Sequence, residues 1–357
     1  MAPHLERSIV AQIVRAGLLA PSGDNCQPWR FVWNERELDL MLVYERAESL
    51  YDVQHTASWI ALGATITNMR LVARSRGYDV SAELFPRGHG ESHAARISFQ
   101  PMTPHHDPLM SALEARCANR RPYQRTPLTA ALRDALLAIA RNGPGTSLEL
   151  VETNQAKRTA AALAARNDQI LFENRALHDG LYRWLRWTPQ GSGDGMPIGS
   201  LELHPVERPG FHLLGSWPVA HTLAACGVTR LLPLRTQRTY QRSAALGLLT
   251  VEGQRPEDFV HAGEVLERLW LTSTLQGLAF QPITGMICLL LRCRLAEGQG
   301  LSPRHRALVE DTGAQLARVF PALAHRTPIM LFRIGFAAPP TARTPRRPVE
   351  DVLSLES

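Results

Sequence analysis

Two groups of residues in this 357-residue chain suit the binding of a planar, phosphorylated ligand. The first is the loop at residues 21–29, in which Ser22, Asn25 and Gln27 stand between an apolar helical pattern and an alternating run at residues 29–33. The alternation predicts a half-buried strand, and Pro, Gly and Asp end the helix before it. An amide side chain on a loop held at both ends can donate to and accept from a heterocyclic ring. The alternative is a plain turn with an apolar exit, which the spacing alone favours.

The second group consists of arginines near residue 116 and near the C-terminus. A guanidinium group binds a phosphate through two parallel hydrogen bonds, which is the reason to expect arginine at such a site. The chain carries 39 Lys+Arg against 33 Asp+Glu, a net charge of +6, but these cations are scattered along it. Scattered charge of mixed sign is typical of a solvated surface, so no nucleic-acid partner is expected. For each arginine the alternative is an exposed charge that contributes little.

The segment at residues 20–31, Ala-Pro-Ser-Gly-Asp-Asn-Cys-Gln-Pro-Trp-Arg-Phe, closely resembles the APSxxNxQPWxF signature of the FMN-dependent nitroreductase superfamily. In that family this loop lies against the isoalloxazine ring. The resemblance therefore implies an FMN site in which the following residues of the loop take part: Pro21, Ser22, Gly23, Asn25 and Gln27.

Residues 116–120, Arg-Cys-Ala-Asn-Arg, resemble the Arg-x-Ser-x-Arg element with which the family grips the FMN phosphate and ribityl chain. The resemblance assigns this contact to Arg116 and Arg120. Ala118 stands where the family usually has Ser, so one hydroxyl contact is missing. The C-terminal arginines resemble the Arg-rich ending that reaches the phosphate, and these are Arg343, Arg346 and Arg347.

Residues 282–285, Pro-Ile-Thr-Gly, resemble the Pro-x-x-Gly turn whose backbone N–H approaches flavin N5. The resemblance places Pro282, Thr284 and Gly285 at this edge of the ring, and glycine permits a close approach of backbone to ligand. Many relatives have Glu at the position of Thr284, so the tuning of the flavin differs here.

The elements that must position these residues follow from periodicity. The pattern predicts, for the N-terminal part, a helix at 5–20, strands at 29–33 and 38–44, a helix at 56–76 and strands at 80–84 and 94–99. For the rest it predicts helices at 109–118, 128–141, 154–188, 256–277 and from 302 onward, and strands at 147–151, 246–251 and 329–334. Residues 189–246 show no clean period, and a long irregular segment of this kind predicts a lid or binding loop.

The two long helices predicted at 56–76 and 256–277 show an internal sequence repeat at an offset of 200 residues. Gly63 and Gly263, Leu71 and Leu271, and Gly77 and Gly277 each match at this offset. With the same order of helix and strands around them, duplication is the better interpretation. We predict an α+β chain of two nitroreductase-like halves, residues 1–104 and 105–357, the second with a lid-like insertion at about 189–246.

Each half carries only some of the expected FMN-binding residues, so we predict that the two halves together form one complete site. Nitroreductases are usually homodimers with the flavin between the subunits. A chain of two such halves is similar to the Acg-type subgroup, in which one chain mimics the dimer. We therefore expect a monomer or weak homodimer with mixed or antiparallel sheets.

Other classes of site and location are less consistent with the sequence. The five cysteines are odd in number and form no Cys-x-x-Cys, which argues against disulfide or zinc frameworks and favours a reducing cytoplasm. His89 and His93 are separated by Gly90, so no metal site is expected. The longest apolar run, at residues 286–291, is too short to span a bilayer, and no membrane partner is predicted.

The expected function is an FMN-dependent oxidoreductase that uses NAD(P)H to reduce an electron-poor small molecule, a nitro compound or a quinone, by a ping-pong cycle. The cofactor carries the chemistry, so no side chain need act as acid or base. Two alternatives use the same residues. One is a flavin-binding or storage protein without turnover, and the other is a dehydrogenase of a dedicated biosynthetic substrate.

Overall fold

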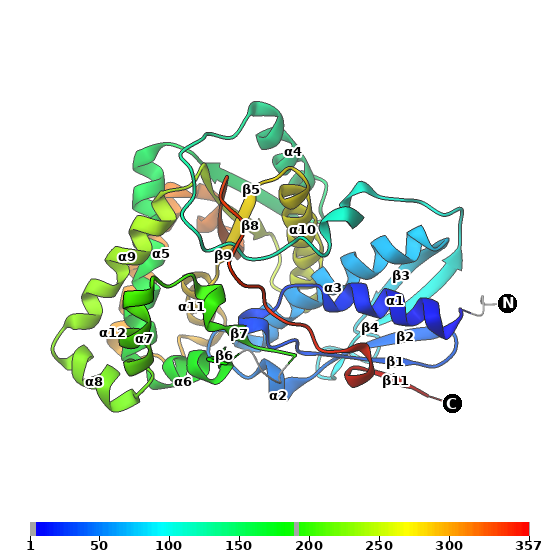
Figure 1. Ribbon diagram of the computed structural model, residues 1–357, viewed down its shortest axis with the longest axis horizontal. Coiled ribbons are helices and arrows are strands. Elements are labelled where there is room, and N and C mark those ends of the chain that lie inside the picture. The colour runs from blue at the N-terminus through cyan, green and yellow to red at the C-terminus, as the bar shows by residue number, and fades with distance from the viewer. Residues whose placement is uncertain (1–4, 189–192, 357) are drawn as a thin grey trace.

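A computed structural model of the chain describes residues 5–188 and 193–356 (Figure 1). In its first sheet, four strands lie in the spatial order β1-β2-β4-β3, and each neighbouring pair is antiparallel. The strands are β1 (Trp29–Trp33), β2 (Glu37–Leu42), β3 (Tyr78–Leu84) and β4 (His93–Pro101). Helix α1 (Arg7–Leu18) precedes this sheet, and α3 (Thr56–Ser75) connects β2 to β3 after the short α2 (Tyr44–Ala47).

The second sheet repeats this arrangement with later elements. Its spatial order is β5-β8-β10-β9, and all neighbours are antiparallel. The strands are β5 (Thr146–Val151), β8 (Ala245–Val251), β9 (Ala279–Ile283) and β10 (Thr327–Gly335). Helix α4 (Ala130–Arg141) precedes the sheet as α1 does, and α10 (Pro256–Leu275) connects the second strand to the third as α3 does. The two halves thus share one topology, as expected from a duplication.

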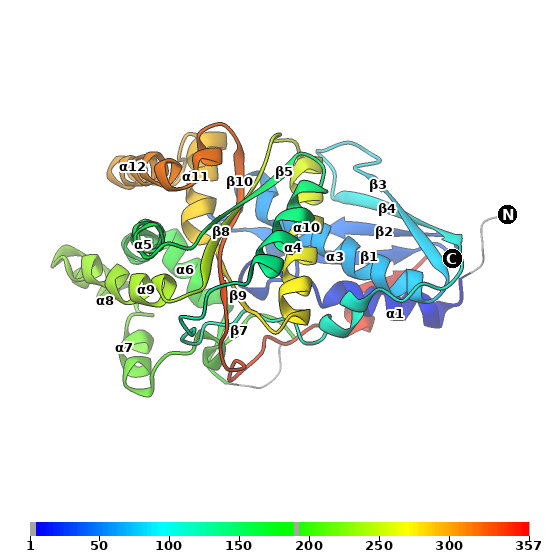
Figure 2. The ribbon, with the colours of Figure 1, turned by 90° about the horizontal axis from the view of Figure 1, so that it is seen from above.

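The long helices α3 and α10 pack against each other in the middle of the molecule (Figure 2). A Cβ atom added to Gly63 would lie 1.9 Å from the Val260 carbonyl oxygen, and one added to Gly263 would lie 2.1 Å from the Ile60 carbonyl oxygen. The contact is therefore reciprocal, because each glycine receives the backbone of the residue that precedes its counterpart by three positions. A reciprocal contact is the mark of a two-fold interface, here between halves of one chain.

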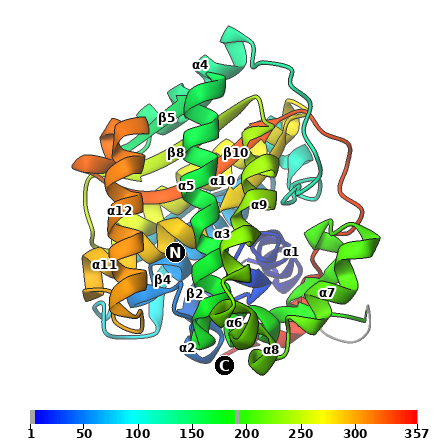
Figure 3. The ribbon, with the colours of Figure 1, turned by 90° about the vertical axis from the view of Figure 1, so that its left-hand side faces the viewer.

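The second half differs from the first by two large helical insertions. The first insertion lies between β5 and β8, and the second, between β9 and β10, covers the neighbouring part of the same sheet (Figure 3). The first contains α5 (Asn154–Glu173), α6 (Arg175–Trp184), β6 (Leu185–Arg186), β7 (Met196–Pro197), α7 (Arg208–Leu213), α8 (Trp217–Ala225) and α9 (Leu232–Gln241). The second contains α11 (Gly285–Ala296) and α12 (Pro303–Val319). At the same places the first half has only short connections.

Two predictions about secondary structure are wrong. The expected helix at 109–118 is a single turn at residues 108–112, because the chain beyond it bonds to β9, where the Asn119 N–H donates to the Phe280 carbonyl at 2.9 Å. The segment at 189–246 is mostly helical where it is described, and β8 begins at Ala245. Its short helices pack on α5 as well as on each other, so each is too brief for its period to stand out.

The C-terminal tail returns to the first half. After β10 the chain crosses the molecule, and β11 (Leu353–Leu355) pairs in parallel with β1 (Figure 1). Buried apolar side chains from both sheets, α3 and α10 meet in one large core, and a second core lies between the other face of the second sheet and α5, α11 and α12. A sequence division at residue 104 therefore assigns to the second half a tail that packs on the first. Within the described residues, no helix has the length and apolar character to cross a membrane.

Candidate functional site

The loop that carries the APSxxNxQPWxF pattern has an unusual backbone. Asp24, Asn25 and Gln27 have φ angles of 50°, 57° and 50°, a region that non-glycine residues rarely occupy. The Gln27 N–H donates to the Ser22 hydroxyl at 3.0 Å, which closes the turn. Left-handed residues cluster where the surroundings impose them, and functional sites are the usual places. The chain thus holds a strained polar loop between α1 and β1.

The amide side chains of this loop bind two other backbone segments. Asn25 Nδ2 donates to the carbonyls of Gly195 and Pro345, both at 3.0 Å. Gln27 Nε2 donates to the Gly193 carbonyl at 2.7 Å, and its oxygen accepts from the Arg347 N–H at 3.0 Å. The loop therefore contacts residues 193–197, which we call the strap, and the C-terminal tail.

Charged side chains anchor the strap beside Trp184. Asp194 accepts from Arg46 at 2.6 Å and from Arg186 at 2.7 Å. Both guanidinium groups lie over the Trp184 ring, at 5.4 and 5.6 Å from its centroid. Burial would raise the pKa of Asp194, but the two hydrogen bonds from arginine outweigh it and lower that pKa. Asp194 is therefore ionised over a wide pH range and holds the strap in place.

Two arginines meet next to the loop, Arg116, which is buried, and Arg346, which is half-buried. Arg116 and Arg346 both donate to the Leu19 carbonyl, and Arg346 also donates to the Asn25 side-chain oxygen at 3.0 Å. Arg116 forms a buried ion pair with Glu267, with 3.0 Å between its Nε and Oε1. Glu267 can neutralise only one of the two cations.

Arg346 is left with an uncompensated charge. Its Nε is buried without a hydrogen-bond partner, and burial together with the nearby Arg116 lowers its pKa to about 9. A buried cation of this kind is unfavourable unless an anion binds it. The phosphate of FMN would supply the missing charge and acceptor, so the residues present fit that group.

The segment at residues 116–120 reaches the turn at 282–285 through β9. Ala118 forms a parallel bridge with Phe280, three residues before Ile283 at the end of that strand. Arg120 donates to the Ser200 carbonyl at 3.1 Å. It also donates to the sulfur of Met196, which belongs to the strap. The structure thus gathers the first loop, Arg116, Arg120 and the strap in one region.

The turn at residues 282–285 is in contact with α5. A Cβ atom on Gly285 would lie 2.4 Å from the side-chain atoms of Asn167 on α5, so a larger residue here would displace the Asn167 side chain. Asn167 in turn accepts from the Tyr51 hydroxyl at 2.9 Å. Thr284 and Gly285 begin α11, whose N-terminal N–H groups carry partial positive charge. This end of the site is electron-withdrawing, which suits a ring that accepts electrons.

Several polar side chains line a hollow between these parts. Asp24, Asp168 and Tyr240 are only half-buried, yet burial is the leading cause of the raised pKa of each. Asp24 and Tyr240 both act on the charge of Arg120, and Asp168 acts on Tyr240, so these groups lie close together. We call the partly open region that they border the hollow. The pKa of Asp24 and that of Asp168 both rise to about 6. Burial also lowers the pKa of Arg120.

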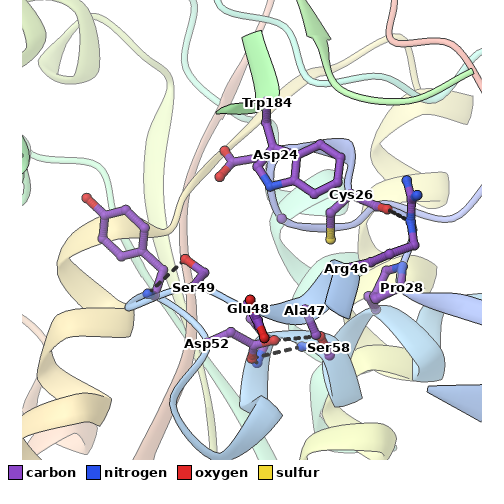
Figure 4. A pocket seen from close by; sticks show the side chains of 14 residues that line it. Asp24, Cys26, Pro28, Arg46, Ala47, Glu48, Ser49, Asp52, Ser58 and Trp184 are labelled. Atoms are coloured by element: carbon purple, nitrogen blue, oxygen red, sulfur yellow. Dashed lines mark hydrogen bonds between the residues drawn. The ribbon is translucent and has the colours of Figure 1, made fainter. Parts of the chain in front are cut away.

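Part of this space is visible as a cavity of about 50 Å³ beneath the loop (Figure 4). Asp24, Cys26, Arg46 and Trp184 are among the side chains that line it. Asp52 lies on its floor and accepts from the Ser58 hydroxyl at 2.5 Å. A cavity of this size holds only a few water molecules, so a flavin ring would lie in the adjoining hollow.

Not every arginine expected at the phosphate lies there. Arg343 donates to the Glu114 carbonyl at the surface, away from Arg116 and Arg346. Arg347 is held through its backbone, and its guanidinium donates to the Asp351 carbonyl at 2.8 Å. We retain Arg116, Arg120 and Arg346 as the candidate phosphate and ring contacts.

Sequence reasoning missed the residues that wall the hollow from α5 and α9. Asp168 accepts from the Thr236 hydroxyl, and Tyr240 lies near Arg120. Asp168 on α5 and Tyr240 on α9 come together only because these two helices pack on each other, so no local pattern identified them. Asp194 was visible in the sequence passage Asp-Gly-Met-Pro, but its role needed the two arginines that the fold supplies.

Comparisons with known proteins agree with the resemblance. No protein-family model matches the chain. It is 25% identical over 358 residues to acg of Mycobacterium tuberculosis, whose name marks it as a proposed NAD(P)H nitroreductase, and the match covers 98% of this chain and 96% of that protein. The chain is a full-length homologue of acg. It is also 27% identical over 349 residues to the uncharacterised protein MT1398 of the same organism, covering 97% of this chain.

The chain spans about half the length of MT1398, at 48% of that protein. Among solved structures, the FMN-dependent nitroreductase NfnB from Mycobacterium smegmatis in complex with NADPH gives a TM-score of 0.40 at 16% identity, covering 70% of this chain and 98% of NfnB. The α+β architecture of two related halves is shown by the chain's own topology.

Proposed function

We propose that this chain is an FMN-dependent oxidoreductase that takes electrons from NAD(P)H and delivers them to a small electron-poor acceptor. The observation that carries the proposal is Arg346, a half-buried arginine whose buried Nε has no hydrogen-bond partner and which stands beside the buried Arg116. These two arginines stand at the loop whose sequence resembles the flavin loop of nitroreductases. The full-length similarity to acg supports the same activity.

When bound, FMN would supply the redox chemistry, accepting two electrons as hydride from NAD(P)H and passing them to the acceptor. Arg116 and Arg346 would hold its phosphate, and Arg120 would face the ring and ribityl chain. The first turn of α11, with Thr284 and Gly285, would lie at the N5 edge. The strap and Asn25 would keep water from one side of the ring.

For the acceptor we propose a quinone or a nitro compound, reduced after NAD(P)+ has left. A quinone takes two electrons and two protons to become a hydroquinone, which balances one NAD(P)H and one proton from solvent. The hollow carries two carboxyl groups, Asp24 and Asp168, that could pass this proton.

The decisive experiment records the visible absorption spectrum of the purified protein before and after anaerobic addition of NADPH. We expect a bound flavin spectrum that bleaches and then recovers when a quinone is added. Arg346→Gln should lose the flavin, whereas Arg343→Gln, a matched change at the surface, should keep it. A colourless protein that binds no added FMN would contradict the proposal.

One observation favours a second function, the storage of flavin without turnover. Asn25 and Gln27 bind the strap directly, and Asp194 fixes it with two arginines, so the loop is covered. A cover of this kind would exclude a second substrate. A bound flavin that NADPH fails to bleach, although dithionite does, would favour this alternative.

A further inference from the structure

Helix α9 departs from the amphipathic pattern expected for a surface helix, because leucines lie on its solvent face. Its solvent face carries Leu231, just before its start, and Leu234, which expose 63% and 49% of their surface. Its inner face carries Thr236, bonded to Asp168, and Tyr240, which lines the hollow. A surface helix normally directs apolar side chains inward. Exposed leucines on α9 therefore need an explanation other than core packing.

The exposed apolar side chains of the molecule gather in this region. Six of the eight large ones that the described residues expose lie between positions 187 and 234. Scattered single apolar residues are normal on a surface, but such a concentration marks an interaction site. Figure 3 shows α7, α8 and α9 together at the end of the molecule that faces the viewer.

The same region is strongly basic. Residues 203–251 contain five arginines, all exposed, and a single carboxylate, Glu207. Glu207 pairs with Arg235 at 2.6 Å, which joins α9 to Val206 and the start of α7. Among the described residues no carboxylate lies within ion-pair distance of the other four arginines, which are Arg208, Arg230, Arg238 and Arg242.

Leucine and arginine share one side of α9. Positions 231, 234, 235 and 238 follow the i, i+3, i+4, i+7 spacing that places residues on one helical face. We call this the α9 face and define it by Leu231, Leu234, Arg235 and Arg238. Apolar side chains flanked by arginines are typical of helices that lie in the interface of a bilayer with anionic head groups.

We propose that the α9 face, with Val206 and Arg230 beside it, docks the protein on the surface of an anionic lipid bilayer. Leucine side chains would enter the head-group boundary while the arginines bind lipid phosphates. The absence of a spanning segment in the sequence does not bear on such a contact, because a surface contact needs only one exposed face.

This contact is independent of the function proposed above, but the two combine. The inner face of α9 lines the hollow, so a bilayer against its outer face would lie one helix away from the candidate flavin. If the proposed function holds, the acceptor class would then be a lipid-soluble quinone.

The test measures co-sedimentation of the purified full chain with vesicles. One set contains equal parts phosphatidylglycerol and phosphatidylcholine, and the other contains phosphatidylcholine alone. We expect binding to the anionic vesicles only, with a partition coefficient that falls as salt screens the arginines. Absence of binding to anionic vesicles at low salt would overturn the proposal whatever the flavin experiment shows.

Variants separate a docking face from net positive charge. Arg230→Gln with Arg238→Gln should lower the partition coefficient about 20-fold, since each arginine near an anionic surface contributes roughly fivefold. Arg36→Gln with Arg76→Gln makes the same charge change at exposed positions of the first half and should lower it less than about twofold. Equal losses in the two pairs would overturn the proposal.

Leu231→Ser with Leu234→Ser tests the apolar contribution and should lower binding about tenfold, because buried leucine side chains favour transfer from water. Light scattering on the same samples tests a second copy of the chain as occupant. A dimer that these serine variants convert to a monomer, with vesicle binding unchanged, would assign the face to self-association instead.

Discussion

The two halves of this chain share a strand order, but they differ in their inserted helices and in the residues that they contribute to the candidate site. The first half connects its strands by short turns, whereas the second inserts α5–α9 and α11–α12 at the corresponding places. The first half contributes the loop at 21–29, and the second contributes the paired arginines and the walls of the hollow. Duplication therefore provided a symmetric frame, and on the function proposed above divergence then divided one site between its copies.

The symmetric part of the frame is the contact between α3 and α10. Gly63→Ala and Gly263→Ala should each destabilise the fold by about 4 kcal/mol or more, because each Cβ would meet a backbone carbonyl at about 2 Å. Urea unfolding measures the change. Gly180→Ala in α6, where a Cβ meets nothing, should be neutral or stabilising. Costs that differ widely between the two central glycines would contradict the two-fold reading.

The asymmetric part of the frame is the arginine pair. Arg346→Met should weaken FMN binding about 100-fold, since the loss of a buried charge contact with phosphate costs roughly 3 kcal/mol. The same change should leave the flavin-free protein as stable as before or more stable, because it removes an uncompensated buried cation. Flavin fluorescence titration and thermal unfolding test the two halves of this prediction. A large loss of stability without FMN would show that Arg346 is structural.

Asp24 offers a pH test on the first-half loop. Burial raises the pKa of Asp24 from 3.8 to about 6, so the folded protein holds this proton more tightly than the unfolded chain. Its contribution to stability is present below about pH 4 and is lost as the pH rises through 6. Asp24→Asn should therefore stabilise the flavin-free protein by about 3 kcal/mol at pH 7.5, since one pKa unit corresponds to about 1.4 kcal/mol. The difference between variant and parent should vanish at pH 4, and a difference independent of pH would refute the assignment.

The smallest effect concerns the strap. Gln27→Met removes the hydrogen bonds to the Gly193 carbonyl and from the Arg347 N–H without adding a buried charge, and each lost hydrogen bond costs about 1 kcal/mol. We expect faster release of bound flavin, measured by the recovery of its fluorescence on dilution. Gln54→Met, the same change at a glutamine that donates to the Leu295 carbonyl at the surface, should leave the rate unchanged.

Local sequence determined the frame well. The helices α3 and α10, the β1–β2 hairpin and the offset of 200 residues all follow from periodicity and from glycine at matching places. These features depend on contacts within one element or on a repeat, and both leave a pattern in the chain. The start of α12 is also set locally, since the Ser302 hydroxyl accepts from the His305 N–H.

Tertiary structure alone decided the rest. No pattern in the sequence places Asn167 above Gly285, or sends the Arg343 side chain to the surface while the Arg346 Nε is buried. These outcomes depend on how the insertions and the tail pack against the other half. Contacts between side chains from distant segments form only when those segments pack, so they depend on shape and charge in three dimensions. The residue types therefore predicted a flavin-binding site, but only the fold determined which of these residues lie next to one another.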